Sequence, residues 1–432
     1  MKIQALLASL FLGLVACGGT ELDLAGVDSV DSALVTLAPP SFAGGVTDRR
    51  SIRETAVTLP AAGGSYVDPD FKTKIIRVTD AKAFGATGCY HSYSSVPATN
   101  VDTTRILVAC GNAARLYKFD KATDRPTHDN TLTAGQAYSI NWESAIWSGQ
   151  NPNILYVLGA PSGQRITRLY QVDVTRTDAG RFTLVKDFAG VWGGTWTIWQ
   201  LSRSEDDNVF SFHLRDSSGN YYRSGAFIRS QAKAVMFPDT AFLVDETYVE
   251  KGGRYITING KGANAYTIKI WNPWTNAVTT TLTNTATNKV GGHYDEGSTF
   301  YVNGDRFATG LLVRGWGALA APKNVFQYQR ADGTLNWNIA DHVSMRNANE
   351  AFAVLSTYGY MDPAWPAFQH EIVLVKTDGT GFSRVAHTRS AGKASSYWSE
   401  PRASVDRDGR YVVFTSDHNT YQNDVWMVKL PL

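Results

Sequence analysis

The sequence carries almost no signal for α-helices. Outside the first 16 residues, no window of the 432-residue chain repeats apolar residues at the i, i+3, i+4 and i+7 positions of a helix face. Lysine and arginine form no basic run, and the net charge is only +2. These absences favour an all-β protein and argue against nucleic acid as a partner.

Compact catalytic motifs are missing as well. The chain contains no HExxH or GxSxG motif, no P-loop, no CxxCH haem site and no EF-hand loop. Local sequence therefore assigns no reaction, and any active site has to be assembled from residues that are far apart in the sequence.

The chain does contain an internal repeat. Residues 397–430 read as three short strands with a turn at 406–409, and the pattern returns roughly every 50 residues to give seven copies. Their second strands are predicted at 105–110, 153–158, 208–212, 254–258, 306–311, 350–355 and 410–414, and a fourth, outer strand follows most copies, for example at 335–339. We predict a seven-bladed β-propeller with four-stranded blades over residues 66–432. A β-sandwich or two unrelated β-domains are the alternatives.

The seventh copy has no outer strand of its own. The chain stops at Leu432, and the segment 72–80, ahead of the first copy, has the alternation of an outer strand. We predict that residues 73–79 complete the last blade. Ring closure of this kind removes the open edges of the sheets.

The N-terminus indicates export. Residues 1–16 combine Lys2 with an apolar run that is too short to span a bilayer, as in a signal peptide. The sequence LVACG around Cys17 resembles a bacterial lipobox, which implies lipidation of Cys17, a membrane anchor, and a place in the bacterial cell envelope, at the outer membrane or cell surface. An ordinary secretory signal with a chance cysteine is the alternative. Residues 17–65, rich in small and polar residues, read as a flexible tether.

Two further cysteines fall on predicted hairpin partners. Cys89 lies near the start of one strand, and Cys110 lies at the end of the next. Antiparallel pairing would place them side by side, and an exported protein would oxidise them to a disulfide. Two buried free thiols are the alternative.

Polar residues recur where the first strand of each blade begins. First strands line the channel of a propeller, so these residues should converge although they are distant in sequence. The set comprises His91, His293, His342, Glu143, Glu246, Asp295 and Glu400. The histidines could ligate a metal or act as a base, and the carboxylates could complete the shell or pair with Arg346 or Arg402. Alternatively, these groups only satisfy one another and ordered water.

Aromatic residues in loop regions suggest a sugar site, because aromatic faces stack on sugar rings. The candidates are Trp199, Trp316, Tyr360, Trp365 and Trp398, and the loops 315–324 and 358–369 are longer than a tight hairpin needs. Packing between blades is the alternative for these rings.

The final repeat, SEPRASVDRDGRYVVFTSD followed by NDVWMVKL, resembles the TolB-type blade, and the whole ring with axial histidines is similar to the oligogalacturonate lyases. That resemblance implies one divalent metal ion near His293 and His342, with His91 as the base. The positions of the other polar residues lead us to expect that Glu400 completes the metal site and that Arg346 or Arg402 faces a uronate carboxylate. The chain lacks the closely spaced histidine pair that the family carries late in its sequence.

Two functions follow from these patterns. The first is an exported propeller, expected to be a monomer, that binds a glycan or a protein partner through its channel face. The second is a metal-assisted polysaccharide lyase that cleaves uronate-containing chains by β-elimination. A purely structural role is the third reading.

Overall fold

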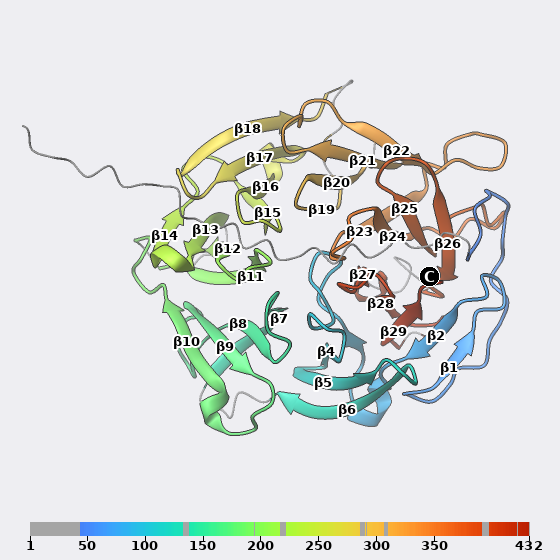
Figure 1. Ribbon diagram of the computed structural model, residues 1–432, viewed down its shortest axis with the longest axis horizontal. Helices are drawn as coiled ribbons and strands as arrows, with labels where there is room; N and C mark the ends of the chain where they lie inside the picture. Colours follow the sequence, from blue (N-terminus) through green and yellow to red (C-terminus); the bar gives the residue numbers. More distant parts are fainter. Residues whose placement is uncertain are drawn as a thin grey trace, which may run out of the picture. The chain divides into compact units, whose positions relative to one another are not determined.

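Seven antiparallel sheets are arranged in a ring (Figure 1). The computed structural model describes residues 44–431, apart from 133–137, 194, 217–221, 286–289, 291, 306–309, 391–396 and 421. The predictions for the signal peptide, for Cys17 and for the first part of the tether lie outside the described residues. The prediction of a seven-bladed β-propeller is confirmed.

The first four blades each contain four strands, listed from the first strand outward. Blade 1 has β3 (Cys89–Tyr90), β4 (Arg105–Cys110), β5 (Ala113–Asp120) and β6 (Arg125–Leu132), and blade 2 has β7 (Tyr138–Trp147), β8 (Ile154–Pro161), β9 (Arg168–Asp173) and β10 (Phe182–Asp187). Blade 3 has β11 (Thr197–Arg203), β12 (Val209–Arg215), β13 (Tyr222–Ile228) and β14 (Lys233–Met236), and blade 4 has β15 (Val244–Val249), β16 (Ile256–Gly260), β17 (Thr267–Asn272) and β18 (Ala277–Thr283).

The remaining blades complete the ring. Blade 5 has β19 (Tyr294–Glu296), β20 (Phe300–Asp305), β21 (Gly310–Gly315) and β22 (Lys323–Gln327), and blade 6 has β23 (Ile339–Ser344), β24 (Phe352–Gly359), β25 (Glu371–Lys376) and β26 (Phe382–His387). Blade 7 has β27 (Ser404–Val405), β28 (Tyr411–Ser416), β29 (Asp424–Lys429), β2 (Lys74–Arg77) and β1 (Ser65–Val67). Short 3₁₀ turns are η1 (Ala81–Phe84), η2 (Ala179–Arg181), η3 (Arg229–Gln231), η4 (Gly262–Asn264) and η6 (Tyr397–Ser399), and no helix of the described chain is long and apolar enough to cross a membrane.

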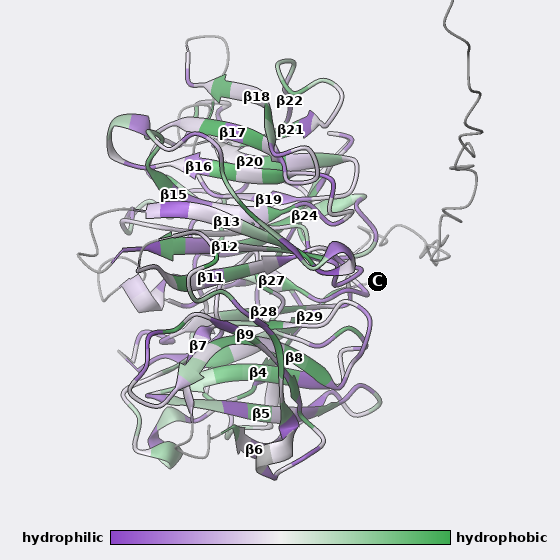
Figure 2. Ribbon diagram, turned by 90° about the vertical axis from the view of Figure 1, so that its left-hand side faces the viewer, coloured by the Kyte–Doolittle hydropathy of each residue, from purple (hydrophilic) through white to green (hydrophobic). Residues whose placement is uncertain are grey.

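The hydrophobic core lies between neighbouring blades. Apolar residues concentrate in the strands and hydrophilic residues in the loops (Figure 2). One cluster joins Val354 of blade 6 to Val412 of blade 7, and another joins Met427 of blade 7 to Val108 of blade 1. Because each sheet buries both faces against its neighbours, the ring stabilises the channel residues that it surrounds.

Ring closure occurs as predicted within residues 73–79. Strand β2 pairs antiparallel with β29, with Ile76 opposite Met427. Strand β1 then pairs with β2, so this blade has five strands instead of the predicted four.

The prediction of a flexible tether is wrong for residues 44–65. Val46 and Arg384 exchange two backbone hydrogen bonds of 3.0 and 2.9 Å at the edge of β26, and the Ser51 hydroxyl donates to the Trp365 carbonyl at 2.5 Å. These contacts all involve backbone groups, which every residue carries, so they need no apolar alternation in the sequence. The composition of residues 44–65 therefore did not predict them.

The predicted strand assignment fails in two blades. In blade 5 the second strand is β20 and not 306–311, and the predicted outer strand 335–339 is mostly the loop that leads into β23. In blade 7 the residues that open the last repeat form the turn η6, and the first strand, β27, begins only at Ser404. Very short first strands, of three and two residues, explain both errors.

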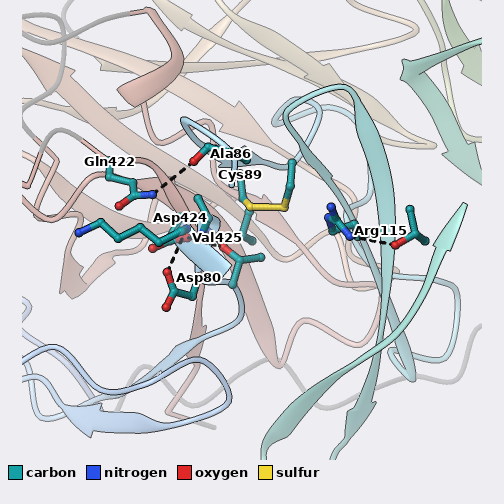
Figure 3. The surroundings of a disulfide bond; sticks show 12 residues. Asp80, Ala86, Cys89, Arg115, Gln422, Asp424 and Val425 are labelled. Carbon is teal, nitrogen blue, oxygen red and sulfur yellow. Dashed lines mark hydrogen bonds between the residues drawn. A yellow bond between two sulfur atoms is a disulfide. The ribbon is translucent and has the colours of Figure 1, made fainter. Parts of the chain in front are cut away.

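A disulfide joins Cys89 and Cys110 (Figure 3). The two residues are directly opposite each other where β3 pairs with β4, and both are buried. The hairpin geometry that predicted the bond is therefore present in blade 1.

Candidate functional site

A cavity of about 600 Å³ opens at one end of the channel. It lies where the first strands of blades 4 and 6 begin and where the turns after β16 and β24 project. We call it the mouth cavity; its side-chain wall includes Asp245, Glu246, Asn259, Tyr266, His293, Tyr328, Trp337, Asn338, Asp341, Tyr358, Tyr360 and Glu400. Loops that lead into first strands and loops that join second to third strands share one end of a propeller, and this brings the distant residues together.

Two of the three predicted axial histidines meet beside this cavity. The rings of His293 and His342 stack with their centroids 4.0 Å apart and their planes at 21°. Tyr358 contacts the same ring, with centroids 4.8 Å apart, and its own centroid lies 6.4 Å from that of His293. The three rings form a compact cluster from blades 5 and 6.

Both imidazoles are held neutral. The Nδ1–H of His293 donates to the Asp341 carbonyl at 2.5 Å, which leaves Nε2 as an acceptor. Burial lowers the pKa of His293, and Arg402 adds to this effect. Burial lowers the pKa of His342 well below its ordinary value, and the neighbouring His293 and Arg402 add to this effect.

The predicted metal ligands do not fit a metal. The Nε2 of His342 lies 3.8 Å from Oε2 of Glu400, and the rings of His293 and His342 are stacked on each other. Among the described residues, no group of three or more His, Cys, Asp or Glu side chains is arranged to hold a metal ion. The arrangement therefore contradicts the prediction for His293, His342 and Glu400.

His91 does not serve as the predicted base. Its Nε2–H donates to the Arg402 carbonyl at 2.6 Å, so its Nδ1 accepts from the Thr415 hydroxyl at 3.1 Å. Burial lowers the pKa of His91 to about 4. With both ring nitrogens in use, His91 links blade 1 to blade 7 and takes no proton from a substrate.

Asp295 and Arg346 are also structural. The Arg346 Nε donates to Asp295 Oδ2 at 2.8 Å, its Nη2 donates to Oδ1, and the backbone amide of Met345 donates to Oδ2 at 2.6 Å. Asp295 is fully buried. Arg346 lies at the far end of the channel, beside Arg203 and Arg407, where turns between first and second strands meet. This pair therefore neither binds nor activates a ligand at the mouth.

The Arg402 side chain contacts residues of its own segment. It is 1% exposed, and its guanidinium lies over the rings of Tyr397 at 4.6 Å and Trp398 at 4.9 Å. It also donates to the carbonyl oxygens of Glu400 and Tyr397. The side chain holds together the segment that leads into β27, so the structure does not support a catalytic role.

Glu143 and Trp398 line a second, separate cavity of about 310 Å³ between blades 1 and 2. Trp398 is 39% exposed and contacts Tyr90 with a ring distance of 5.0 Å. These two predicted binding residues are therefore brought together, but away from Glu246 and Tyr360.

Of the other predicted aromatic residues, one lines the mouth cavity and three lie elsewhere in the propeller. Tyr360 is 71% exposed and lines the mouth cavity. Trp199 stacks on His213 within blade 3. Trp316 donates to the Gly297 carbonyl at 3.1 Å, at the turn between β19 and β20, and Trp365 is buried. Neither of the last two rings lines the mouth cavity.

Two exposed aromatic residues of the mouth cavity were missed by sequence reasoning. Trp337 is 62% exposed, and Tyr266 is 41% exposed. Trp337 falls in the segment 335–339, whose alternation predicted an outer strand. A correct count of the strands in blade 5 would have placed it in a loop at the mouth.

Carboxylates give the mouth cavity its charge. Burial and the negative charge of Asp245 raise the pKa of Glu246 to about 7, against hydrogen bonds from Tyr248 and Asn259. The pKa of Asp245 is also raised, by burial. Asp341 accepts a hydrogen bond of 2.7 Å from the Tyr328 hydroxyl.

No family model matches the chain, and no curated protein matches it in sequence. Solved structures do match. The chain shares its fold with oligogalacturonate lyases. A structure of oligogalacturonate lyase in complex with manganese has a TM-score of 0.59 at 11% identity, covering 89% of this chain and 99% of that chain. Oligogalacturonate lyase from Vibrio parahaemolyticus gives 0.57 at 10% identity, covering 85% and 96%. At this identity the likeness to the lyases concerns the fold alone.

Proposed function

We propose that this propeller binds an oligosaccharide in the mouth cavity. The observation that carries the proposal is the wall itself: exposed aromatic rings and polar groups surround about 600 Å³, which is the volume of a small-ligand site. The alternative of a protein partner would favour a broad surface of about 800 Å² per partner over a concave cavity.

The ring faces supply the stacking surfaces. Trp337 and Tyr360 are 62% and 71% exposed, which is unusual for such large apolar side chains. Sugar rings present C–H faces that pack on aromatic faces, while their hydroxyls hydrogen-bond to carboxylates and amides such as Glu246 and Asn259. One wall of the cavity therefore offers both kinds of contact that a sugar needs.

We also propose that the protein is exported and that a lipid on Cys17 anchors it to the membrane. The LVACG sequence supports the anchor, and the disulfide between Cys89 and Cys110 supports an oxidising compartment. A Cys17→Ala variant should move from the membrane fraction to the soluble fraction. If it stays with membranes after a high-salt wash, the anchor is disproved.

A polysaccharide lyase is the second candidate. It is favoured by the fold shared with oligogalacturonate lyases and by the neutral His293, which lines the cavity with an acceptor nitrogen. β-Elimination also needs a cation to neutralise the uronate carboxylate. Incubation with oligogalacturonate should then produce the ultraviolet absorbance of an unsaturated uronate, and a His293→Ala variant should not.

Binding to an array of neutral, amino and uronate oligosaccharides tests the main proposal. Trp337→Ala and Tyr360→Ala should each weaken binding about tenfold, the effect of losing one stacking contact. Trp398→Ala is the matched control, because it removes an exposed tryptophan from the other cavity. No binding to any glycan, or a loss only in the Trp398 variant, would overturn the proposed site.

A further inference from the structure

The second cavity, of about 310 Å³ between blades 1 and 2, opens at the same end of the ring as the mouth cavity. We call it the blade 1–2 cavity. Gly111 and Asn112, which form the turn after β4, line it. The equivalent turns of blades 4 and 6, after β16 and β24, line the mouth cavity. Because turns between second and third strands share one end of a propeller, a ligand that approaches this end meets both cavities.

One short segment borders both cavities. Trp398 lines the blade 1–2 cavity, and Glu400, two residues later, lines the mouth cavity. Two residues of chain span at most about 7 Å even when fully extended. The two cavities are therefore neighbours.

Tyr397 lies beside this border. It is 55% exposed, and its ring centroid is 5.3 Å from that of Trp398. Partial burial raises the pKa of Tyr397, and the negative charges of Glu143, from the blade 1–2 cavity, and of Glu246, from the mouth cavity, add to this effect. Tyr397 is thus within electrostatic reach of a carboxylate from each cavity.

The exposed aromatic rings of the described chain are grouped at these two cavities. Among the described residues, only five tryptophan, tyrosine or phenylalanine side chains are exposed. They are Tyr266, Trp337 and Tyr360 at the mouth cavity, Tyr397 beside the border, and Trp398 at the blade 1–2 cavity. Large exposed rings that gather on one part of a surface mark a binding site.

The blade 1–2 cavity has the composition of a sugar site. Its floor includes the buried Ala98, Ala114 and Ala145, whose methyl groups leave space that larger side chains would fill. Its volume lies at the lower end of the range for small-ligand sites. Aromatic and polar groups complete the wall, among them Trp142, Trp398, Ser92, Asn112, Asn141 and Glu143. Stacking faces and hydrogen-bonding groups therefore occur together, as they do in the mouth cavity.

We infer that the blade 1–2 cavity is a second sugar subsite and that one oligosaccharide chain occupies both cavities by crossing Tyr397. This inference rests on the proposed function and defines its ligand as a long oligosaccharide. A chain that is held in the mouth cavity keeps its other end close to the blade 1–2 cavity, so the second contact is made within one complex. Affinity should therefore rise with chain length until both cavities are filled.

Calorimetric titration of the full-length protein tests the inference with three series of oligosaccharides. The probes are oligomers of glucose, of glucosamine and of galacturonate, each from the dimer to the octamer. In a series that binds, the octamer should bind about tenfold or more tightly than the dimer, as expected for one added stacking contact. The gain should stop growing once a chain spans both cavities.

Variants separate a second contact from the larger number of registers that a long chain offers to one site. Trp398→Ala should weaken octamer binding about tenfold and leave dimer binding unchanged, so it is a control for the mouth cavity with short chains. Trp398→Phe keeps a ring and should retain most of the gain. Ala109→Leu fills the blade 1–2 cavity from its half-buried wall and should act like Trp398→Ala. Trp337→Ala should weaken binding of both lengths, because its ring lines the mouth cavity.

The outcomes distinguish the inference from the proposed function. Equal affinity for dimer and octamer would overturn the inference and leave glycan binding intact. A gain with length that survives both Trp398→Ala and Ala109→Leu would do the same. Failure of all three series would overturn the inference, and failure of the array as well would overturn the proposed function.

Discussion

At the far end of the channel, charged side chains occur in pairs. Arg346 holds Asp295 in a bidentate contact, Lys251 lies 3.2 Å from Glu350, and Arg203 lies 3.3 Å from Asp207. At the mouth, carboxylates from separate parts of the chain share one cavity with exposed aromatic rings. Paired charges stabilise the ring, whereas Asp245 and Glu246, which are like charges in one cavity, cost folding free energy, because the charge of Asp245 raises the pKa of Glu246. Proteins commonly keep such unfavourable interactions at binding sites, where they serve function.

The sharpest test of this contrast removes one carboxylate at each end. Asp295→Ala should lower the free energy of unfolding by about 3–5 kcal/mol, because Arg346 would be left buried without its partner. Asp245→Ala, at the exposed rim of the mouth, should change it by less than about 0.5 kcal/mol. Urea unfolding followed by tryptophan fluorescence measures both, and similar losses at the two ends would break the comparison.

The disulfide stabilises the innermost hairpin of blade 1. Its two cysteines are 21 residues apart. Replacing both by alanine should cost about 2–4 kcal/mol. Unfolding with and without reductant measures this cost. Reductant should lower the stability of the wild type and leave the double variant unchanged, and an insensitive wild type would show that the bond does not form.

Glu246 should make stability depend on pH. Its pKa is raised from 4.5 to about 7 in the folded protein, so the unfolded state releases the proton first, and stability falls as the pH rises between these values. Glu246→Gln removes this loss, so the variant should gain about 1–3 kcal/mol over the wild type at pH 8 and little at pH 4. Melting curves across that range measure the difference, and a constant offset would contradict the pKa.

The smallest expected effect concerns two tryptophans. Trp337→Ala should change stability by less than about 0.5 kcal/mol, because the ring is exposed. Trp365→Ala is the buried control and should cost about 3 kcal/mol or more. Thermal unfolding of both variants measures these differences in stability. A large loss of stability in the Trp337 variant would mean that this ring also packs against the rest of the protein.

Periodicity was sufficient to predict the ring, its closure by residues 73–79 and the cysteine pairing. Each depends on alternation along strands, which the sequence displays directly. The site was harder to predict. That His293 and His342 meet follows from blade positions, but that Asp295 turns to Arg346 depends on side-chain directions at a short strand, and no local pattern encodes these. Trp337 was misplaced because β19 is too short to be counted as a strand.

The closure of blade 7 has a consequence for the folding of the chain. Strands β2 and β29 come from residues 74–77 and 424–429, so that blade contains contacts between opposite ends of the sequence. The last blade therefore cannot form until residue 429 has been synthesised. Until then, the backbone groups of β2 that pair with β29 have no partner strand. Folding of the ring should be completed late and slowly, as expected for contacts so distant in sequence.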